Sequence, residues 1–397
     1  MITRYKLFCE SLKNRISTDI PLPNDIIEIS NAYIKAGKDI FLVGGAVRDF
    51  VKGISPKDYD LVTNALPNES KEILKGFNVS DEQGKNFGVL RVFTKDEPTG
   101  YEIASYRKDI SGGRDTKGDD QKVEMGDNVT IEDDCNRRDL TINALFYDIK
   151  KKQIIDLVGG VDDIKNGIIR AVGDASQRFI EDRLRILRVF RFAARTGGKI
   201  EDKTADAIKK DNRLKGIGPK DDVSQERIWE EMLKAFKQAK SYKQYLEFFN
   251  EFDMWEQVFP GSKINTNIEE AHKLTSYIAN LFKFEDTKNL KTKMVQSYKI
   301  ADKYDTAPKV VFLLDLLKLT PENALDLYKK KVRCHCEVDQ IIDWLDTCGV
   351  HDKIFIRFID YIPSVSSEDL ISKGFKKNKA LGDEIKRLEI EKFKQML

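Results

Sequence analysis

Apolar and polar residues alternate along the N-terminal part of the chain with two different periods. Residues 21–37 carry apolar side chains at helical spacing, which predicts an amphipathic helix, and the apolar run at residues 39–43 predicts a strand. Residues 87–93 and 101–106 also have strand character, and the turn-rich residues 95–100 connect them. Helices and short strands are therefore mixed in this part of the chain.

Beyond residue 107 the pattern changes twice. Residues 108–136 are polar and glycine-rich, which predicts a long loop of the kind that is usually functional or disordered. From about Asp156 the spacing is predominantly helical, with its clearest breaks at residues 216–219 and 259–261. The pattern predicts the α+β class, with a small α/β head followed by a long helical body.

A glycine turn and a pair of carboxylates supply the first candidate chemistry. Residues 41–49 read Phe-Leu-Val-Gly-Gly-Ala-Val-Arg-Asp, and Asp58 and Asp60 follow in a strand-like run. Side chains at i and i+2 of a strand point to the same face, so both carboxylates can converge on one point. Such a pair can hold Mg²⁺, and two ions can clamp the attacking and leaving oxygens of a phosphoryl transfer. The simpler alternative is two surface acids on a hairpin.

The glycines themselves indicate where a phosphate chain could lie. Gly44 and Gly45 let the backbone approach a triphosphate, and residues 46–51 have the pattern of a helix start. The free N–H groups and positive dipole end of a helix N-terminus favour an anion. Arg48 adds a charged fork for phosphate. The alternative for Gly44 and Gly45 is an ordinary tight turn.

Length and charge narrow the class of protein. The chain has 397 residues, so about two to four domains are expected. Its 68 basic and 66 acidic residues nearly cancel, so the total charge does not indicate a polyanion binder and any basic surface is local. Five scattered cysteines, with no long apolar segment and no secretory leader, favour a reduced, cytoplasmic protein without membrane attachment.

A second cluster of polar residues lies at residues 137–145, Arg-Arg-Asp-Leu-Thr-Ile-Asn-Ala-Leu. Arg137, Asp139 and Asn143 could contact triphosphate and ribose, while the apolar positions anchor a helix or strand. A salt-bridged junction between domains is the alternative.

A third cluster occupies residues 179–195 and predicts one amphipathic helix, with Asp174 as its N-cap and Gly197 at its end. One stripe of this helix is apolar, and the neighbouring stripe consists of arginines at helical spacing. These arginines are Arg185, Arg188, Arg191 and Arg195. An arginine stripe beside a carboxylate site suits a polyphosphate.

Asp182 and Arg185 are three residues apart and would be neighbours on that helix. Cytosine and adenine each have an exocyclic amine next to an acceptor nitrogen. A carboxylate could accept a hydrogen bond from the amine, and a guanidinium could donate one to the nitrogen. Uracil and guanine have a carbonyl oxygen in place of the amine, so the carboxylate would reject them. The alternative is a salt bridge on a solvated helix face.

Together these motifs resemble the class II tRNA nucleotidyltransferases, the CCA-adding enzymes of bacteria and eukaryotes, which share their head with bacterial poly(A) polymerases. The resemblance runs from about residue 21 to residue 397. It rests on residues 42–49, Asp58-Tyr-Asp60, residues 137–143 and Glu181-Asp182-x-x-Arg185. Where the family usually carries His-Gly-Thr, residues 87–89 read Phe-Gly-Val, and residues 375–378 depart from its usual Gly-Pro turn.

The resemblance implies a nucleotidyltransferase head followed by an all-helical neck, body and tail, and a role for each motif. We expect an N-terminal extension at residues 1–20, the head at 21–150, the neck at 151–215, the body at 216–300 and the tail at 301–397. Asp58 and Asp60 would be metal ligands for two Mg²⁺ ions, and Glu102 matches a third acidic position. Asp182 and Arg185 would pair with CTP and then with ATP, while the long segment at residues 108–136 resembles the loop needed for the final adenosine. The implied reaction is attack of a tRNA 3′-hydroxyl on the α-phosphate of CTP or ATP. The partners are then tRNA, CTP and ATP, with no stable protein partner.

Two other functions share part of this pattern. A poly(A) polymerase would have the same head motifs, but residues 79–93 lack the Gly-Arg-Arg-Phe-like run that such enzymes tend to show. An inactive RNA-binding homologue is opposed by the retention of Asp58, Asp60 and Glu102. Cys334-His-Cys336, with Cys348 and His351, could hold zinc, but the helical pattern around them favours packed thiols.

Overall fold

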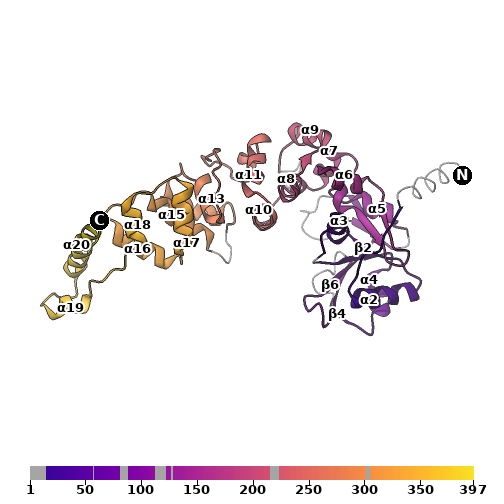
Figure 1. The fold of residues 1–397 in the computed structure, drawn as a ribbon, viewed down its shortest axis with the longest axis horizontal. Coiled ribbons are helices and arrows are strands. Elements are labelled where there is room, and N and C mark those ends of the chain that lie inside the picture. The colour runs from indigo at the N-terminus through magenta and orange to yellow at the C-terminus, as the bar shows by residue number, and fades with distance from the viewer. Residues whose placement is uncertain are drawn as a thin grey trace. The chain divides into compact units, whose positions relative to one another are not determined.

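The computed structural model describes residues 15–56, 58–80, 88–111, 122–126, 128–214, 223–300 and 305–397 (Figure 1). The chain divides into two compact units. The first comprises Met1–Ser224 with Gln238–Ser241, and the second comprises Gln225–Lys237 with Tyr242–Leu397. The expected boundaries of head, neck, body and tail within these units stay predictions.

A mixed β-sheet forms the centre of the first unit. Its eight described strands lie in the order β1-β10-β9-β2-β3-β6-β5-β4. β3 and β6 are parallel, and the other neighbours are antiparallel. The strands are β1 (Arg15–Ser17), β2 (Ile40–Val43), β3 (Asp60–Thr63), β4 (Asn78–Ser80), β5 (Val89–Phe93), β6 (Tyr101–Ser105), β9 (Leu145–Asp148) and β10 (Gln153–Asp156).

Burial explains why β2 and β3 lie in the middle of this sheet. Leu42, Val43, Leu61 and Val62 are all buried, so these strands have consecutive apolar residues instead of an alternating pattern. Val43 pairs with Asp60, which places the first residue of β3 beside the glycine turn that follows β2. The sheet therefore brings the candidate carboxylates next to the candidate phosphate turn.

The predicted strands agree with the structure, except around Asp58. β2 and β6 confirm the strands expected at residues 39–43 and 101–106, and β5 confirms the described part of residues 87–93. The expectation that Asp58 shares a strand with Asp60 is wrong, because β3 begins only at Asp60.

Helices flank this sheet in the first unit. α2 (Asn24–Lys35) confirms the amphipathic helix expected at residues 21–37 and buries Ile26, Ile29 and Tyr33. α2 and α4 (Pro67–Ile73) lie together beside the sheet (Figure 1). The other helices of this unit are α3 (Gly45–Val51), α5 (Ile131–Asn136), the 3₁₀ turn η1 (Thr141–Asn143), α6 (Gly160–Asn166), α7 (Ala175–Glu181), α8 (Leu184–Thr196) and α9 (Asp202–Lys210).

The loop expected at residues 108–136 is partly wrong. β7 (Arg107–Ser111) pairs with β8 (Lys122–Met125), and α5 follows. Thr130 and Asp133 close a capping box at the start of α5: Thr130 Oγ1 accepts from Asp133 N–H over 3.2 Å, and Asp133 accepts from Thr130 N–H over 3.0 Å. Backbone pairing and capping thus form structure that needs few apolar anchors. Residues 112–121 lie outside the described part of the chain.

The single helix expected at residues 179–195 is also wrong, because it is two helices. α7 starts at the expected cap, where Asp174 accepts from Gln177 N–H over 2.9 Å, and α8 ends at Gly197, whose φ is +68°. Asp182 is extended between them, with φ −154°. Its carboxylate accepts from Leu184 N–H over 3.1 Å, so it competes with helix continuation and caps the next helix.

The second unit is helical in its described residues, as expected. Aromatic side chains fill much of its interior, including Tyr245, Phe249, Phe282 and Trp344. α13, α15 and α17 pack together (Figure 1). The helices are α10 (Gln225–Gln238, whose last residue belongs to the first unit), α11 (Tyr242–Glu251), α12 (Trp255–Val258), α13 (Leu274–Leu281), α14 (Thr287–Gln296), α15 (Thr306–Leu316), α16 (Ala324–Arg333), α17 (Val338–Thr347), α18 (Lys353–Ile359), α19 (Ser367–Ser372) and α20 (Lys379–Met396).

The two expected helix breaks differ in outcome. The break at residues 259–261 is confirmed, since α12 ends at Val258 and Gly261 has a φ of +67°. The break at residues 216–219 lies outside the described residues.

Cys334 and Cys336 are buried and donate to the carbonyls of Lys331 and Glu337 over 3.4 and 3.9 Å.

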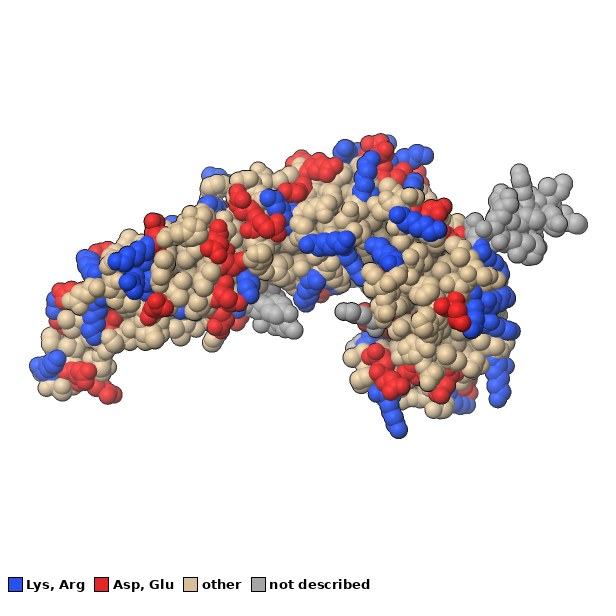
Figure 2. All heavy atoms as spheres, in the orientation of Figure 1, with Lys and Arg blue, Asp and Glu red and all other residues tan. Residues whose placement is uncertain are grey.

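Surface charge is mixed over both units. On the face drawn in Figure 2, basic and acidic side chains are interspersed, as the nearly balanced composition suggests. None of the helices in the described ranges is long and apolar enough to cross a bilayer.

Candidate active site

A cavity of about 700 Å³ in the first unit collects most of the candidate residues. Six basic and four acidic side chains line it. They are Arg48, Lys52, Arg138, Arg188, Arg195 and Lys240, with Asp49, Asp58, Asp60 and Asp139; Gly44, Gly45, Ile54, Ser55, Asn143 and Phe192 complete the lining. The cavity is therefore polar, rich in positive charge, and large enough for a nucleotide.

The glycine turn forms one wall of this cavity. Gly44 has a φ of +66°, which a residue with a Cβ adopts only under strain, and its N–H donates to Leu145 O over 3.1 Å. A Cβ at Gly44 would lie 3.7 Å from Arg138 Nη1, so the guanidinium closely approaches this backbone. α3 starts directly after the turn at Gly45. The expected juxtaposition of a helix N-terminus, two glycines and an arginine is present.

Arg48 is buried and joins three elements. Its Nη1 donates to Asn143 Oδ1 over 2.6 Å, and its Nε and Nη2 donate to Asp49 Oδ1 over 2.9 and 2.8 Å. Its guanidinium also lies 5.3 Å from the ring centroid of Phe192 in α8. The orientation of Arg48 is thus fixed by α3, η1 and α8 together.

Asp58 and Asp60 line the same cavity, and both are exposed. Protein atoms crowd the carboxylate of Asp60 and raise its pKa, and the negative charges of Glu102 and Asp58 raise it further, whereas Arg138 lowers it. A bound cation would reduce the repulsion among these negative charges. Two carboxylates fit Mg²⁺, which takes its other ligands from water and substrate phosphates.

Glu102 lies beside this pair without lining the cavity. It is exposed on β6, where it is paired across the strands with Arg91 of β5 and forms an ion pair with that arginine. Within the described ranges, no group of three or more His, Cys, Asp or Glu side chains is arranged to hold a metal ion. The structure therefore brings Asp58 and Asp60 to the cavity and keeps Glu102 at its side, engaged with Arg91.

The arginine pair before η1 is clamped by a residue that sequence reasoning did not single out. Asp134 has no exposed side-chain surface and accepts from Arg137 Nε over 2.8 Å and from Arg138 Nη2 over 2.9 Å. Burial alone would raise its pKa, but the charges of Arg138 and Arg137 outweigh burial and lower it. Arg138 reaches the cavity, whereas Arg137, the predicted phosphate ligand, does not line it.

Asp139 connects the same segment to α8. It accepts from Arg188 Nε over 2.7 Å and from Leu140 N–H over 2.8 Å. Burial opposes ionisation of Asp139, yet the charge and hydrogen bonds of Arg188 hold its pKa well below the ordinary range. Residues 137–145 therefore contribute Asp139 and Asn143 to the cavity lining and a contact to α8, while phosphate binding and a domain junction stay predictions.

Phe192 is the centre of the arginine face of α8. The guanidinium of Arg191 lies 4.4 Å from its ring centroid, and those of Arg188 and Arg195 lie 6.0 Å away. Arg188 and Arg195 line the cavity, whereas Arg191 is buried and donates to Gln238 Oε1 over 2.9 Å. Burial, together with the charge of Arg48, lowers the pKa of Arg195.

Two lysines in the cavity were missed by sequence reasoning. Lys52 follows Arg48 by one helical turn, and this i+4 spacing was a usable signal. Partial loss of solvent around the exposed Lys52 side chain and the charge of Arg48 lower its pKa. Lys240 comes from a short segment that returns to the first unit, where its N–H donates to Ala194 O over 3.0 Å. Nothing local in the sequence marks Lys240.

Asp182 and Arg185 do not line the cavity, and both are buried. The alternative of a salt bridge on a solvated face is therefore wrong. Arg185 Nη1 donates to Glu181 Oε2 over 2.7 Å, and its Nη2 donates to Arg137 O over 2.8 Å. Arg185 is thus held in place one turn before Arg188, which does reach the cavity.

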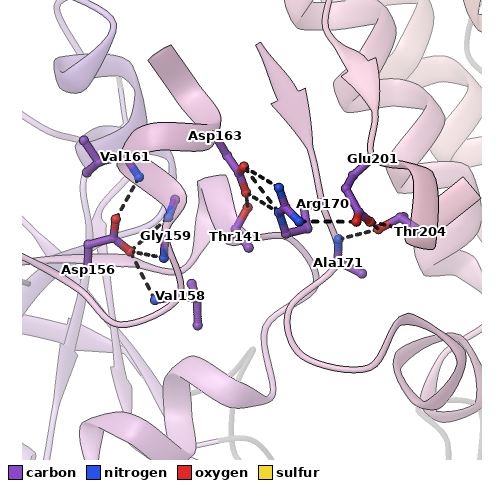
Figure 3. A network of polar contacts seen from close by, with 11 residues as sticks. Thr141, Asp156, Val158, Gly159, Val161, Asp163, Arg170, Ala171, Glu201 and Thr204 are labelled. Atoms are coloured by element: carbon purple, nitrogen blue, oxygen red, sulfur yellow. Dashed lines mark hydrogen bonds and ion pairs between the residues drawn. The ribbon is translucent and has the colours of Figure 1, made fainter. Parts of the chain in front are cut away.

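A network that includes the buried acids Asp156 and Asp163 holds η1 (Figure 3). Asn143, the last residue of η1, accepts a hydrogen bond from Arg48. Asp163 accepts from Thr141 Oγ1 over 2.6 Å and from Arg170 Nε over 3.0 Å. Arg170 continues to Glu201 over 3.3 Å. The carboxylate of Asp156 accepts from the N–H groups of residues 158–161, which fixes the turn into α6.

Known proteins match the chain over different lengths. The family described as "Poly A polymerase head domain" matches residues 40–170. A CCA-adding enzyme of Ligilactobacillus salivarius is 30% identical over 411 residues, which cover 97% of this chain and 94% of the relative. Poly(A) polymerase I of Escherichia coli O157:H7 is 34% identical over 232 residues, 57% of this chain. The chain spans about half the length of that relative, 48%.

Solved structures show the same fold. The crystal structure of the Bacillus stearothermophilus CCA-adding enzyme in complex with CTP superposes with a TM-score of 0.67 at 21% identity. The match covers 92% of this chain and 91% of that chain. At this identity the likeness concerns the fold, and it extends through both units.

Proposed function

Because the chain belongs to the tRNA nucleotidyltransferase and poly(A) polymerase family, we propose that it adds CCA to the 3′ end of tRNA from CTP and ATP. The observation that carries this proposal is the shared cavity, where Asp58 and Asp60 face six basic side chains. The CCA-adding enzyme of L. salivarius supports it further, because that relative is matched along nearly its whole length.

Two kinds of hydrogen-bond donor in the cavity would bind the triphosphate. The glycine turn and the start of α3 offer backbone N–H groups, and Arg48 and Arg188 offer guanidinium groups that are already oriented by Asn143 and Asp139. Oriented donors lose little freedom when a substrate binds, and they stabilise charge that develops during phosphoryl transfer.

Asp58 and Asp60 would hold two Mg²⁺ ions, which would supply Lewis-acid stabilisation of the attacking and leaving oxygens. In the proposed reaction the tRNA 3′-oxygen forms a bond to the α-phosphorus, and the bond to the pyrophosphate breaks. Arg138 and Arg188, which line the cavity, would balance the negative charge on the departing phosphates.

The base would be selected at the start of α8. Asp182 would accept a hydrogen bond from the exocyclic amine that cytosine and adenine share. Arg185 would donate a hydrogen bond to the acceptor nitrogen beside that amine. A guanidinium has five N–H donors, and among the described residues Arg185 uses three of them, toward Arg178 O, Glu181 and Arg137 O. Its other donors would serve the base in a fixed plane.

Two parts of the proposal concern the rest of the chain. The helical second unit would carry tRNA, including the lysine-rich tail with Lys373, Lys376, Lys377 and Lys379. The segment at residues 108–136 would assist the final adenosine. A cytoplasmic location belongs to the same proposal.

A poly(A) polymerase is the second candidate, since E. coli poly(A) polymerase I shares 34% identity over 232 residues. The test is extension of a tRNA that ends at its discriminator base, with Mg²⁺ and with CTP and ATP supplied singly and together. We expect two cytidines from CTP alone and a terminal adenosine only when both nucleotides are present. Long adenosine tails from ATP alone would favour the second candidate, and no incorporation would favour an inactive RNA-binding homologue.

A further inference from the structure

Asp134 contacts both arginines of the pair at residues 137 and 138 through its side chain. Its Oδ1 accepts from Arg137 Nε over 2.8 Å and Nη2 over 2.5 Å, and its Oδ2 accepts from Arg138 Nε over 3.2 Å and Nη2 over 2.9 Å. The exposed fraction of its side chain is 0%. A fully buried carboxylate with two arginine forks fixes the direction of both guanidinium groups.

Arg138 is the arm of this clamp that enters the cavity. Its Nη1 donates to Asn143 O over 3.3 Å, and its guanidinium lies 5.0 Å from the ring centroid of Phe146. The guanidinium also closely approaches Gly44, and its charge acts on Asp60. A small rotation of Arg138 would therefore change the positive charge beside both the phosphate turn and the candidate carboxylates.

The second arm of the clamp supports the base-reading residues. Arg185 Nη2 donates to Arg137 O over 2.8 Å, and Arg178 Nη1 donates to Asn136 O over 2.5 Å. The backbone carbonyls just before Arg138 thus accept hydrogen bonds from Arg178 and Arg185, which lie near the break between α7 and α8. Holding the Arg137 side chain fixes the carbonyl that orients Arg185.

The clamp also reaches the paired strands β7 and β8. Asp134 Oδ1 lies 3.4 Å from the N–H of Arg107, the first residue of β7, and this N–H donates to it. The neighbouring Asp133 has a different role, because its side chain caps α5 and pairs with Lys108. Two adjacent acids of α5 therefore have different roles: Asp134 binds the two arginines, and Asp133 caps the helix.

We propose that Asp134 is a positioning residue for nucleotidyl transfer, which aligns Arg138 with the triphosphate and, through Arg137, Arg185 with the base. This inference rests on the proposed function, because it names what orients the residues of that site. Asp134 would touch neither substrate and would act only through the two arginines.

The test compares Asp134→Asn with the control Asp96→Asn, a change at an exposed acid in the turn between β5 and β6. For Asp134→Asn we expect a rise of about tenfold in the KM for CTP and ATP, similar to the effect of losing a residue that orients a ligand, and weaker discrimination against UTP. Asp96→Asn should have wild-type values. A merely structural role would lower the fraction of active enzyme, so reduced kcat with unchanged KM and unchanged discrimination would overturn the proposal.

A double-mutant cycle tests whether Asp134 acts through Arg138. Adding Asp134→Asn to Arg138→Ala should raise the KM no further than Arg138→Ala alone, whereas independent effects that multiply would contradict the inference. If Asp134→Asn does not fold, Arg138→Lys takes its place, since lysine keeps the charge but has no fork for Asp134. A wild-type KM in Arg138→Lys would then reject the alignment.

Equilibrium binding of CTP and ATP to the same variants, followed calorimetrically with Mg²⁺, separates this inference from the proposed function. Wild-type protein that fails to extend tRNA would refute the proposed function. Asp134→Asn that binds both nucleotides like wild type would refute the inference, and weaker binding would support it even without turnover.

Discussion

Arg188 in α8 and Asp139, which lies just before η1, are 49 positions apart in the sequence, yet Arg188 Nε donates to Asp139 Oδ2 over 2.7 Å. Both side chains line the cavity, with exposed fractions of 30% and 10%. The pair therefore gives the arginine face of α8 a fixed position relative to the glycine turn and the carboxylates. It also explains why Asp139 stays ionised although its carboxylate is largely enclosed by protein atoms.

Breaking this pair has a pH-dependent consequence. The folded-state pKa of Asp139 lies below its ordinary value of about 3.9. The ionised carboxylate therefore stabilises the folded protein fully above a pH of about 3.9, and this contribution is lost as the pH falls through the folded-state pKa. We expect Asp139→Asn to lower the free energy of unfolding by about 2 kcal/mol at pH 7. Below a pH of about 4 the difference from wild type should shrink. Urea unfolding of both proteins across this range measures it, and a constant difference would contradict the assignment.

Loss of either cavity carboxylate should remove activity without unfolding the protein. Both Asp58 and Asp60 are exposed, so alanine at either position leaves no buried cavity, but it removes a ligand on which phosphoryl transfer depends. We expect Asp58→Ala and Asp60→Ala to reduce incorporation by about a thousandfold or more. Asp96→Ala, an exposed acid in the turn between β5 and β6, should retain wild-type rates and unfolding temperature.

Arg185 should control the choice of base. Arg185→Ala removes the donor that Glu181 and Arg137 O hold in place, so incorporation of UTP and GTP relative to CTP should rise by about tenfold or more. Single-nucleotide incorporation rates measure this ratio. Arg213→Ala is a matched control, because Arg213 is exposed and pairs with Asp211 outside the cavity. Unchanged selectivity in Arg185→Ala would reject the base-reading role.

Lys240 should contribute to nucleotide affinity. It lines the cavity with five other cations, and a charge-assisted contact to phosphate is worth about 2 kcal/mol. We therefore expect Lys240→Ala to raise the KM for CTP and ATP by about tenfold or more, with a smaller effect at high salt. Lys75→Ala, whose side chain is 72% exposed in an ion pair with Glu72, should leave both KM values unchanged.

Gly160 should be irreplaceable for a packing reason. A Cβ there would lie 2.2 Å from Thr141 O, a backbone atom of the turn that carries Asn143. We expect Gly160→Ala to destabilise the protein by about 2 kcal/mol and to weaken nucleotide binding through Asn143 and Arg48. Gly76→Ala, with no heavy atom within 4 Å of the added Cβ, is the control for thermal unfolding. Equal unfolding temperatures would contradict the contact.

Local patterns were sufficient for part of the fold and the site. The strand before Gly44, the helix after it and the arginines of α8 follow from hydrophobic period and from turn chemistry within about ten residues. Arg48 and Asp60 belong to motifs that resemble a known family, and Arg188 was predicted to bind polyphosphate from the arginine stripe of its helix. Each of these inferences needed only near neighbours or a known arrangement.

Local patterns do not reveal other features of the site, even where the interacting residues are near one another in sequence. The apolar period continues across Asp182, so the break between α7 and α8 is hidden until the side chain of Asp182 is seen to cap Leu184. Asp134 looks like one of three acids at the start of α5, and only its burial distinguishes it. Lys240 enters the cavity because a short segment returns to the first unit.

Competition among all four nucleoside triphosphates is the most direct test of the central claim, that this cavity builds CCA on tRNA. A tRNA transcript ending at its discriminator base would be incubated with wild-type protein, Mg²⁺ and equal concentrations of CTP, ATP, UTP and GTP, and its 3′ ends sequenced. We predict ends that read CCA and stop there. Adenosine tails, mixed additions or unextended ends would contradict the claim.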